Sequence, residues 1–187
     1  ELGARFGLAL PMGHFQASNA LSASLLSDVF SYKIPISIEA GYDITPSLVL
    51  GIQAQYGVIV DKSTACGGGT PCSDHDLELG IQGQYHFAPH QAIDPWLGLG
   101  IGYEIESYTT AVLAETYSGT RQGPELVKLQ GGADFKLARI LTVGPFLGFS
   151  VGEYTTETSE GITNGIPAKA LHEWLSFGVK GTFKVGG

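Results

Sequence analysis

Residues 95–108, PWLGLGIGYEIESY, alternate strictly between apolar and small or polar side chains, and this alternation limits the possible folds of the chain. Side chains of an extended strand point in turn to opposite faces. One face of this strand is wholly apolar, whereas the other carries Trp96, three glycines and the acids Glu104 and Glu106. The second face of a soluble sheet would carry many more charges. The pattern therefore indicates a wall with lipid outside and a narrow polar interior.

The composition of the whole chain favours the same interpretation. Glycine supplies 27 of the 187 residues, and 15% of the residues are charged, against about 25% in ordinary soluble proteins. No run approaches the roughly 18 uninterrupted apolar residues of a membrane helix, so a spanning structure must be a barrel. The length fits one domain, which we take as residues 1–187.

Seven further segments repeat the alternation. The connections after the first, third, fifth and seventh segments are long and polar, and the connections after the second, fourth and sixth are short. This is the arrangement of membrane barrels with long external loops and short turns on the other side. The sequence predicts an all-β fold, an eight-stranded antiparallel up-and-down transmembrane β-barrel, with segments at residues 2–10, 33–42, 47–60, 76–87, 95–108, 127–137, 141–154 and 172–185.

Two of the long connections have features of their own. In the first, Ser18 and Asn19 can cap a short helix that runs to Phe30, either as a surface helix or as a lid. In another, Cys66 and Cys72 bracket a glycine-rich loop. Two thiols cannot complete a zinc site and neither lies in a catalytic motif, so we expect a disulfide rather than free thiols. Such a bond requires an oxidising compartment.

Three stretches carry a resemblance to a known group: PWLGLGIGY at 95–103, DITP at 43–46 and GVKGTFKV at 178–185. With them, almost the whole chain resembles the small eight-stranded outer-membrane β-barrels of Gram-negative bacteria, the broad OmpA/OmpX/OmpW-like group. The resemblance implies the bacterial outer membrane as the location, with outer-membrane lipid and lipopolysaccharide as surroundings. The start at Glu1, without an initiator methionine or leader, is expected of an exported protein whose signal peptide has been removed.

The group to which the chain is similar includes adhesins, structural proteins of the envelope, small-solute pores and enzymes that modify lipid A, so the fold does not select a function. Lipid A deacylases use a His and a Ser two positions apart, but Ser176 lies four positions after His172. His14, Ser18 and Asp28 are residue types that palmitoyltransferase barrels use, but nothing in the sequence fixes their geometry. We therefore expect no enzyme and no catalytic residue.

Cofactors, metals and nucleic acids are not expected either. The triplet Asp74-His75-Asp76 is interpreted as a solvated loop edge, and the spacing of the histidines does not suit a metal. The net charge is -8, and the lysines and arginines are scattered singly. A chain of this kind offers no surface for a polyanion.

Charged residues on the inner face are expected to form two groups, which we ordered by counting residues from the short turns. Buried charges must be paired or solvated, because an isolated one costs several kcal/mol. The interior is then either a polar plug or a conduction gate. The first lumen cluster contains Arg5, Glu39, Asp134 and Lys180, and the second contains Glu78, Glu104 and Lys128.

These observations favour an integral outer-membrane barrel with an envelope structural role and a surface-interaction role through its external loops. The alternative is a narrow pore for small solutes or hydrophobic molecules, because the many inward-facing glycines leave room for water. An accessory role beside other envelope proteins in a larger complex fits the same pattern.

Overall fold

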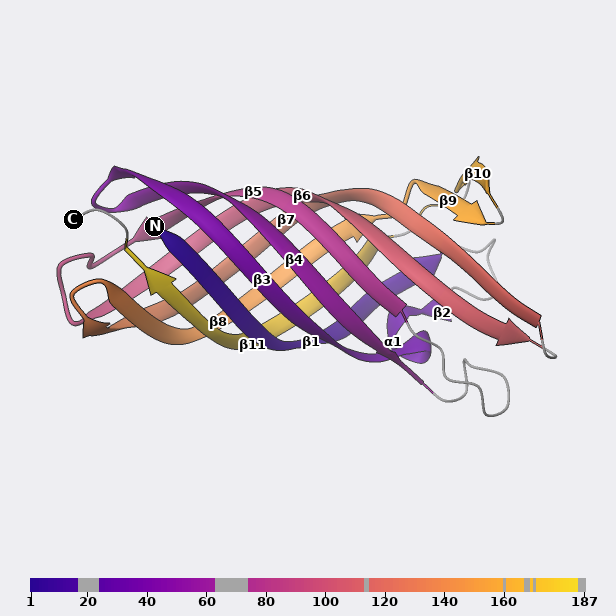
Figure 1. Cartoon of the computed structure of the whole chain (residues 1–187), viewed down its shortest axis with the longest axis horizontal. Coiled ribbons are helices and arrows are strands. Elements are labelled where there is room, and N and C mark those ends of the chain that lie inside the picture. Colours follow the sequence, from indigo (N-terminus) through magenta and orange to yellow (C-terminus); the bar gives the residue numbers. More distant parts are fainter. Residues whose placement is uncertain are drawn as a thin grey trace.

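The fold is an eight-stranded antiparallel β-barrel, which confirms the prediction from the sequence (Figure 1). The computed structural model describes residues 1–16, 24–62, 74–112, 115–159, 161–166, 169 and 171–184. The strands pair with their neighbours in chain order, and the last pairs with the first, so the barrel has no open edge within the membrane. They are β1 (Leu2–Gln16), β3 (Phe30–Thr45), β4 (Leu48–Asp61), β5 (Asp74–His86), β6 (Ile93–Val112), β7 (Glu115–Ala138), β8 (Leu141–Glu153) and β11 (Leu171–Phe183).

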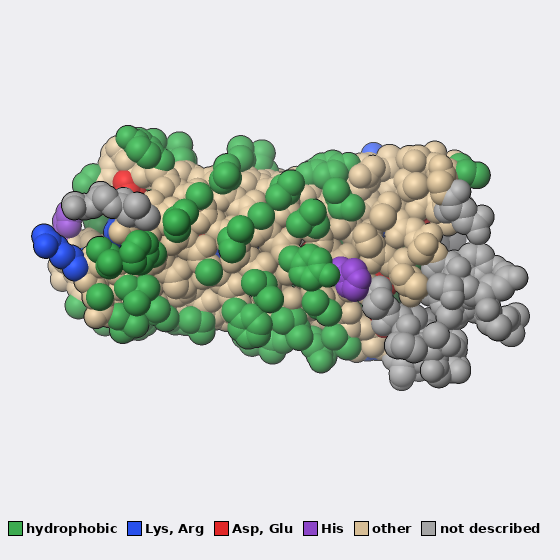
Figure 2. Space-filling view, in the orientation of Figure 1, with side chains coloured by type: hydrophobic (Ala, Val, Ile, Leu, Met, Phe, Trp, Pro, Cys, Tyr) green, Lys and Arg blue, Asp and Glu red, His purple; other side chains and the backbone are tan. Residues whose placement is uncertain are grey.

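The two faces of the wall have the polarity that the alternation predicts. The outward side chains of Phe6, Ile38 and Ile52 are 61%, 64% and 63% exposed, whereas the inward Arg5 and Lys180 are 5% and 1% exposed. Apolar side chains are spread along the outer wall in Figure 2. Such an exterior is unfavourable in water and suits the lipid of a membrane.

The β6–β7 hairpin continues beyond the level at which β5 ends. The last pair between β5 and β6 is His75 with Ser107, but β6 and β7 remain paired as far as Val112 with Glu115 (Figure 1). The sequence predicted a long polar loop at residues 109–124, and this prediction is wrong. The stretch contains four threonines and one tyrosine, residue types that favour strands, and a strand outside the membrane needs no apolar face.

A second hairpin lies inside the loop that the sequence predicted at residues 155–170. It consists of β9 (Thr156–Ser159) and β10 (Ile162–Gly165). β9 adds to the edge of β7, where Gly119 faces Ser159. The extended part of β7 is thus paired on both sides.

The first long connection contains β2 (Ser24–Leu25), which pairs with β1, and α1 (Leu26–Val29). The described part of the predicted helix is therefore a four-residue turn, and residues 17–23 lie outside the described residues. No helix in the described parts of the chain is long and apolar enough to cross a membrane. Cys66 and Cys72 also lie outside the described residues, so their disulfide stays a prediction.

Candidate functional site

The structure brings the four residues of the first lumen cluster together. Arg5 donates a hydrogen bond of 2.5 Å to Oε2 of Glu39 and another to Oε1 of Gln130. Nζ of Lys180 lies 3.3 Å from Oε1 of Glu39 and 4.0 Å from Oδ2 of Asp134. All five side chains are buried. Glu39 is therefore held between two cations, as buried charge requires.

Two neutral side chains complete the first cluster and were not selected from the sequence. Lys180 donates to Oε1 of Gln84 at 2.6 Å, and Nε1 of Trp96 donates to Oδ1 of Asp134 at 3.0 Å. The Trp96 ring also lies 4.4 Å from Nζ of Lys180 and 5.4 Å from Cζ of Arg5. Gln84 and Trp96 both occupy inward-facing positions in the alternation of their strands, and this was the sign in the sequence that they could join the first lumen cluster.

These contacts cross the barrel. β11, which carries Lys180, is separated from β5, which carries Gln84, by β1, β3 and β4 along the ring, so the two residues lie on opposite walls. A cavity of about 10 Å³ beside them is lined in part by Glu39 and Gln82. A volume of this size holds about one water molecule.

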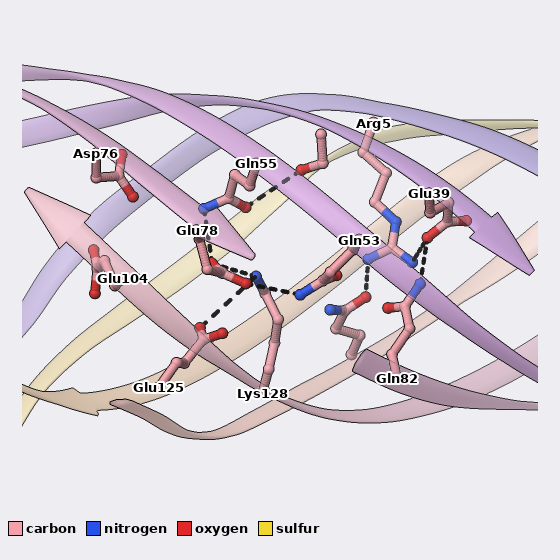
Figure 3. A network of polar contacts seen from close by, with 12 residues as sticks. Arg5, Glu39, Gln53, Gln55, Asp76, Glu78, Gln82, Glu104, Glu125 and Lys128 are labelled. Carbon is pink, nitrogen blue, oxygen red and sulfur yellow. Dashed lines mark hydrogen bonds and ion pairs between the residues drawn. The ribbon is translucent and has the colours of Figure 1, made fainter. Parts of the chain in front are cut away.

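The second lumen cluster is only partly as predicted. Nζ of Lys128 lies 2.6 Å from Oε1 of Glu78 (Figure 3). Glu104 has other partners: its Oε2 lies 2.8 Å from Nε2 of His172 and its Oε1 lies 3.7 Å from Nζ of Lys33. Glu78 and Glu104 face each other directly across β5 and β6. Because like charges in this position repel, each carboxylate turns toward a different cation.

Glu125 belongs to the second cluster and was missed. Gly102 faces Glu125 and Gly100 faces Lys128, so β7 has an extra residue here, a β-bulge. The bulge turns both Glu125 and Lys128 inward, with 3.7 Å between Oε1 and Nζ. A strict alternation counted from Lys128 places Glu125 outside. The two adjacent apolar residues that follow Glu125 are the sequence signal of the bulge.

A third lumen charge group lies nearer the loops, and it corrects the interpretation of Asp74-His75-Asp76 as a loop edge. Asp76 is 1% exposed, and Lys33 donates to its Oδ2 at 2.8 Å. Lys33 also meets Glu104, which His172 contacts from the other side. The alternation of the segment at 76–87 already points Asp76 into the barrel. Its burial was not expected, because the loop was thought to end directly before it.

An apolar cluster covers the loop end of the lumen. Leu26 of α1 and Phe30 pack against Ala9, Ile59 and Trp174, and every member is at most 3% exposed. The rings of Phe30 and Trp174 are stacked with centroids 6.2 Å apart. The described part of α1 therefore turns into the barrel mouth, and the expectation of a surface helix is wrong for this part.

Asp61 at the loop end of β4 lies beyond Val60, the last outward apolar residue of that strand, and Asp74 is the first residue of β5. Burial and the neighbouring carboxylate of Asp74 raise the pKa of Asp61 to about 6. Oδ1 of Asp74 accepts a hydrogen bond of 3.3 Å from the backbone N–H of Thr109. The two acids repel each other in their ionised forms.

The histidines of the lumen are paired with acids and not with a nucleophile. Nδ1 of His86 lies 2.8 Å from Oδ2 of Asp94, and Nε2 of His172 lies 2.8 Å from Oε2 of Glu104. The other nitrogen of each ring has no hydrogen-bond partner among the described residues. The described residues also contain no group of three or more His, Cys, Asp or Glu that is arranged to hold a metal.

The chain matches no protein-family model and no curated protein. Several solved structures have the same fold. Neisserial surface protein A has 14% identity over 97% of both chains and a TM-score of 0.52. OprG from Pseudomonas aeruginosa has 13% identity over 99% of this chain and 96% of its own, with a TM-score of 0.58.

The outer membrane protein AlkL, solved in lipid bilayers, has 15% identity over 100% of this chain and 91% of its own, with a TM-score of 0.52. At these identities the comparison establishes the fold. The shared fold, the apolar exterior and the polar interior together lead to the conclusion that the chain is a small eight-stranded β-barrel of the bacterial outer membrane.

Proposed function

We propose that the protein is a closed, non-conducting barrel that serves the envelope as a structural and surface-interaction protein. The observation that carries this proposal is the bond between Lys180 and Gln84, which joins opposite walls across the lumen. Outer-membrane lipid and lipopolysaccharide surround the wall in this proposal, and partner proteins contact the external hairpins.

Further charge pairs obstruct the lumen above this bond. Lys128 binds Glu78, and Lys33 binds Asp76 closer to the loops. Phe30 and Trp174 then cover the mouth. Removal of one partner from a buried ion pair costs about 3–5 kcal/mol. A passing ion would have to break several such contacts, and this favours a plug over a gate.

Side-chain contacts hold the strands together at the external end of the barrel. Tyr108 donates to Oε1 of Glu157 at 2.7 Å, and Nε of Arg121 lies 3.2 Å from the same oxygen. Cζ of Arg121 lies 4.2 Å from the centre of the Tyr108 ring. These contacts join β6, β7 and β9, so the extended hairpins form one braced sheet. A braced surface loses less conformational entropy when a partner binds.

The proposal contains no reaction. A nucleophile and a base within hydrogen-bond reach are the usual mark of a hydrolytic site. In the described residues the imidazoles of His86 and His172 contact carboxylates instead. The side chains of His14 and Ser18 lie outside the described residues.

Planar-bilayer recording on the purified protein tests the closed lumen. We expect no steady conductance from the wild type and only brief openings, more frequent than in the wild type, from Lys180→Ala, because removal of the bond across the lumen leaves the Lys128–Glu78 and Lys33–Asp76 pairs in place. Lys184→Ala is the matched control, because the side chain of Lys184 is 42% exposed and forms an ion pair with no described residue except Glu1, at 3.9 Å. A steady wild-type conductance would favour the pore.

The surface role is tested by shortening the β6–β7 hairpin to the level of Ser107 and Thr120. The barrel should still fold, because this cut removes no residue of the lumen clusters. In whole cells, chemical crosslinking should give adducts with envelope or external proteins for the wild type, and these should be lost from the shortened variant. Identical adducts from both chains would contradict a contact role for the hairpin.

A further inference from the structure

Two buried carboxyl groups, those of Glu78 and Glu125, share one cation in the lumen. Nζ of Lys128 lies 2.6 and 2.7 Å from the two oxygens of Glu78 and 3.7 Å from Oε1 of Glu125 (Figure 3). Glu78 is 3% and Glu125 is 4% exposed, and their side chains also contact each other. One ammonium group cannot neutralise two carboxylates in a buried site.

Hydrogen bonds distinguish the two acids. Gln53 donates to Oε1 of Glu78 at 2.7 Å and Gln55 donates to Oε2 at 3.1 Å, in addition to Lys128. Oε2 of Glu125 receives no hydrogen bond from any described residue. Several donors stabilise the charged form of a carboxyl group, and a lack of donors favours the neutral form.

The other basic side chains nearby in the lumen are already bound to other acids. Lys33 of β3 lies between Asp76 and Glu104, and His172 of β11 bonds to Glu104. Arg5 of β1 binds Glu39. Asp76 and Glu104 add to the negative potential around the pair. Within the described residues, the second carboxyl group of the pair has no counter-charge of its own.

The local backbone is shaped to bring the two acids together. The bulge in β7 turns Glu125 inward, where an unbroken strand would direct it to lipid. Gly102, which faces it on β6, leaves room for both carboxyl groups. A Cβ atom at Gly102 would lie 3.2 Å from Oε2 of Glu125 and 3.5 Å from Oε1 of Glu78.

We propose that Glu125 is a neutral carboxylic acid that donates its proton to Glu78, so that the pair is a proton-binding site in the lumen. Loss of this proton to solvent water leaves two carboxylates in contact beside one ammonium group. The folded barrel then keeps a proton that the unfolded chain releases, so stability falls as the pH rises. The protonation of Glu125 therefore makes the free energy of unfolding of the barrel depend on pH.

Infrared spectroscopy of the protein in lipid vesicles at neutral pH tests the proposal. The wild type should show the carbonyl band of a protonated carboxyl group, and the difference spectrum against Glu125→Gln should contain this band. Glu157→Gln, which changes an acid outside the barrel, is the control and should leave the band unchanged. Equal carbonyl bands in the wild type and Glu125→Gln would overturn the proposal.

Glu78→Gln provides an independent test if Glu125→Gln fails to fold. With an amide at position 78, Lys128 is left to Glu125, which should ionise, and the band should disappear as well. In urea titrations the folding equilibrium of the wild type should weaken relative to Glu125→Gln by about tenfold per pH unit above the ordinary pKa of a glutamate, about 4.3, and the loss should level off at the pH where the folded barrel releases the proton. Parallel pH profiles would show that the pair binds no proton.

Discussion

Nζ of Lys180 lies 2.6 Å from Oε1 of Gln84 on the opposite wall of the barrel and 3.3 Å from Oε1 of Glu39. One side chain on β11 therefore braces β5 and β3 at the same time. The brace forms only after the last strand has paired with the first, because Lys180 reaches the lumen from the strand that closes the ring.

Lys180→Ala should destabilise the barrel, because it leaves Glu39 with one cation and removes the ammonium group that lies 4.0 Å from Oδ2 of Asp134. We expect a loss of about 3 kcal/mol in the free energy of unfolding, measured by urea titration in lipid vesicles. Lys184→Ala, at the exposed end of the same strand, should change this energy by less than about 0.5 kcal/mol. Equal effects would contradict the brace.

Arg5 and Glu39 should show energetic coupling. Arg5→Ala is expected to cost about 3 kcal/mol, because it leaves the buried carboxylate of Glu39 dependent on Lys180 alone. Removing both partners should cost less than the sum of the single changes, because no unpaired charge remains at that contact. The urea titrations of both single variants and the double variant decide the point. Strict additivity would mean that the two residues do not interact.

Gly144→Ala should impair folding. A Cβ atom at this position on β8 would overlap the backbone oxygen of Ala133 on β7, so one strand must shift. Overpacking of this kind costs about 1–3 kcal/mol. Gly165→Ala on β10 is the control, because a Cβ atom there has no described atom within 4 Å. The fraction of refolded chain that resists unfolding on an unheated gel should fall for Gly144→Ala and not for Gly165→Ala.

Asp61 should make stability depend on pH at the loop end. Its pKa is raised from 3.8 to about 6 by burial and by Asp74, so the folded state holds this proton more tightly than the unfolded chain. The resulting penalty is absent below the lower value, grows as the pH rises between the two values, and is complete above about 6. Asp61→Asn should therefore gain stability over the wild type across that interval. Asp43→Asn, at an exposed position of β3 near the other end of the barrel, should not show this gain.

The spanning part of the fold could be predicted because lipid demands a strict alternation. Phe6 and Arg5 are neighbours in sequence, and the membrane forces them to opposite faces. The depth of Arg5 and Lys180 then follows from counting, because the pairing of β1 with β11 is continuous from Leu2 and Phe183 to these residues, whereas β3 has an irregularity between Asp43 and Thr45. Outside the membrane this constraint ends, and the hairpin beyond Ser107 was missed for that reason.

The lumen contacts could be predicted less well than the wall. Glu125 was missed because a bulge changes the phase of β7, and Glu104 was misplaced because repulsion from Glu78 turns its side chain toward Lys33. The short helix expected before Phe30 was misplaced because the apolar residues of a segment show that it must be buried but not against which surface. Each of these outcomes depends on contacts between distant strands, which a local pattern does not contain.

The height of the β6–β7 hairpin makes the rim of the barrel uneven. β6 continues for five residues beyond Ser107, from Tyr108 to Val112, and this adds about 15 Å along the strand at the usual rise. Among the described strands, the two walls of the barrel therefore end at different heights, and a partner that covered both would need a surface with a matching step.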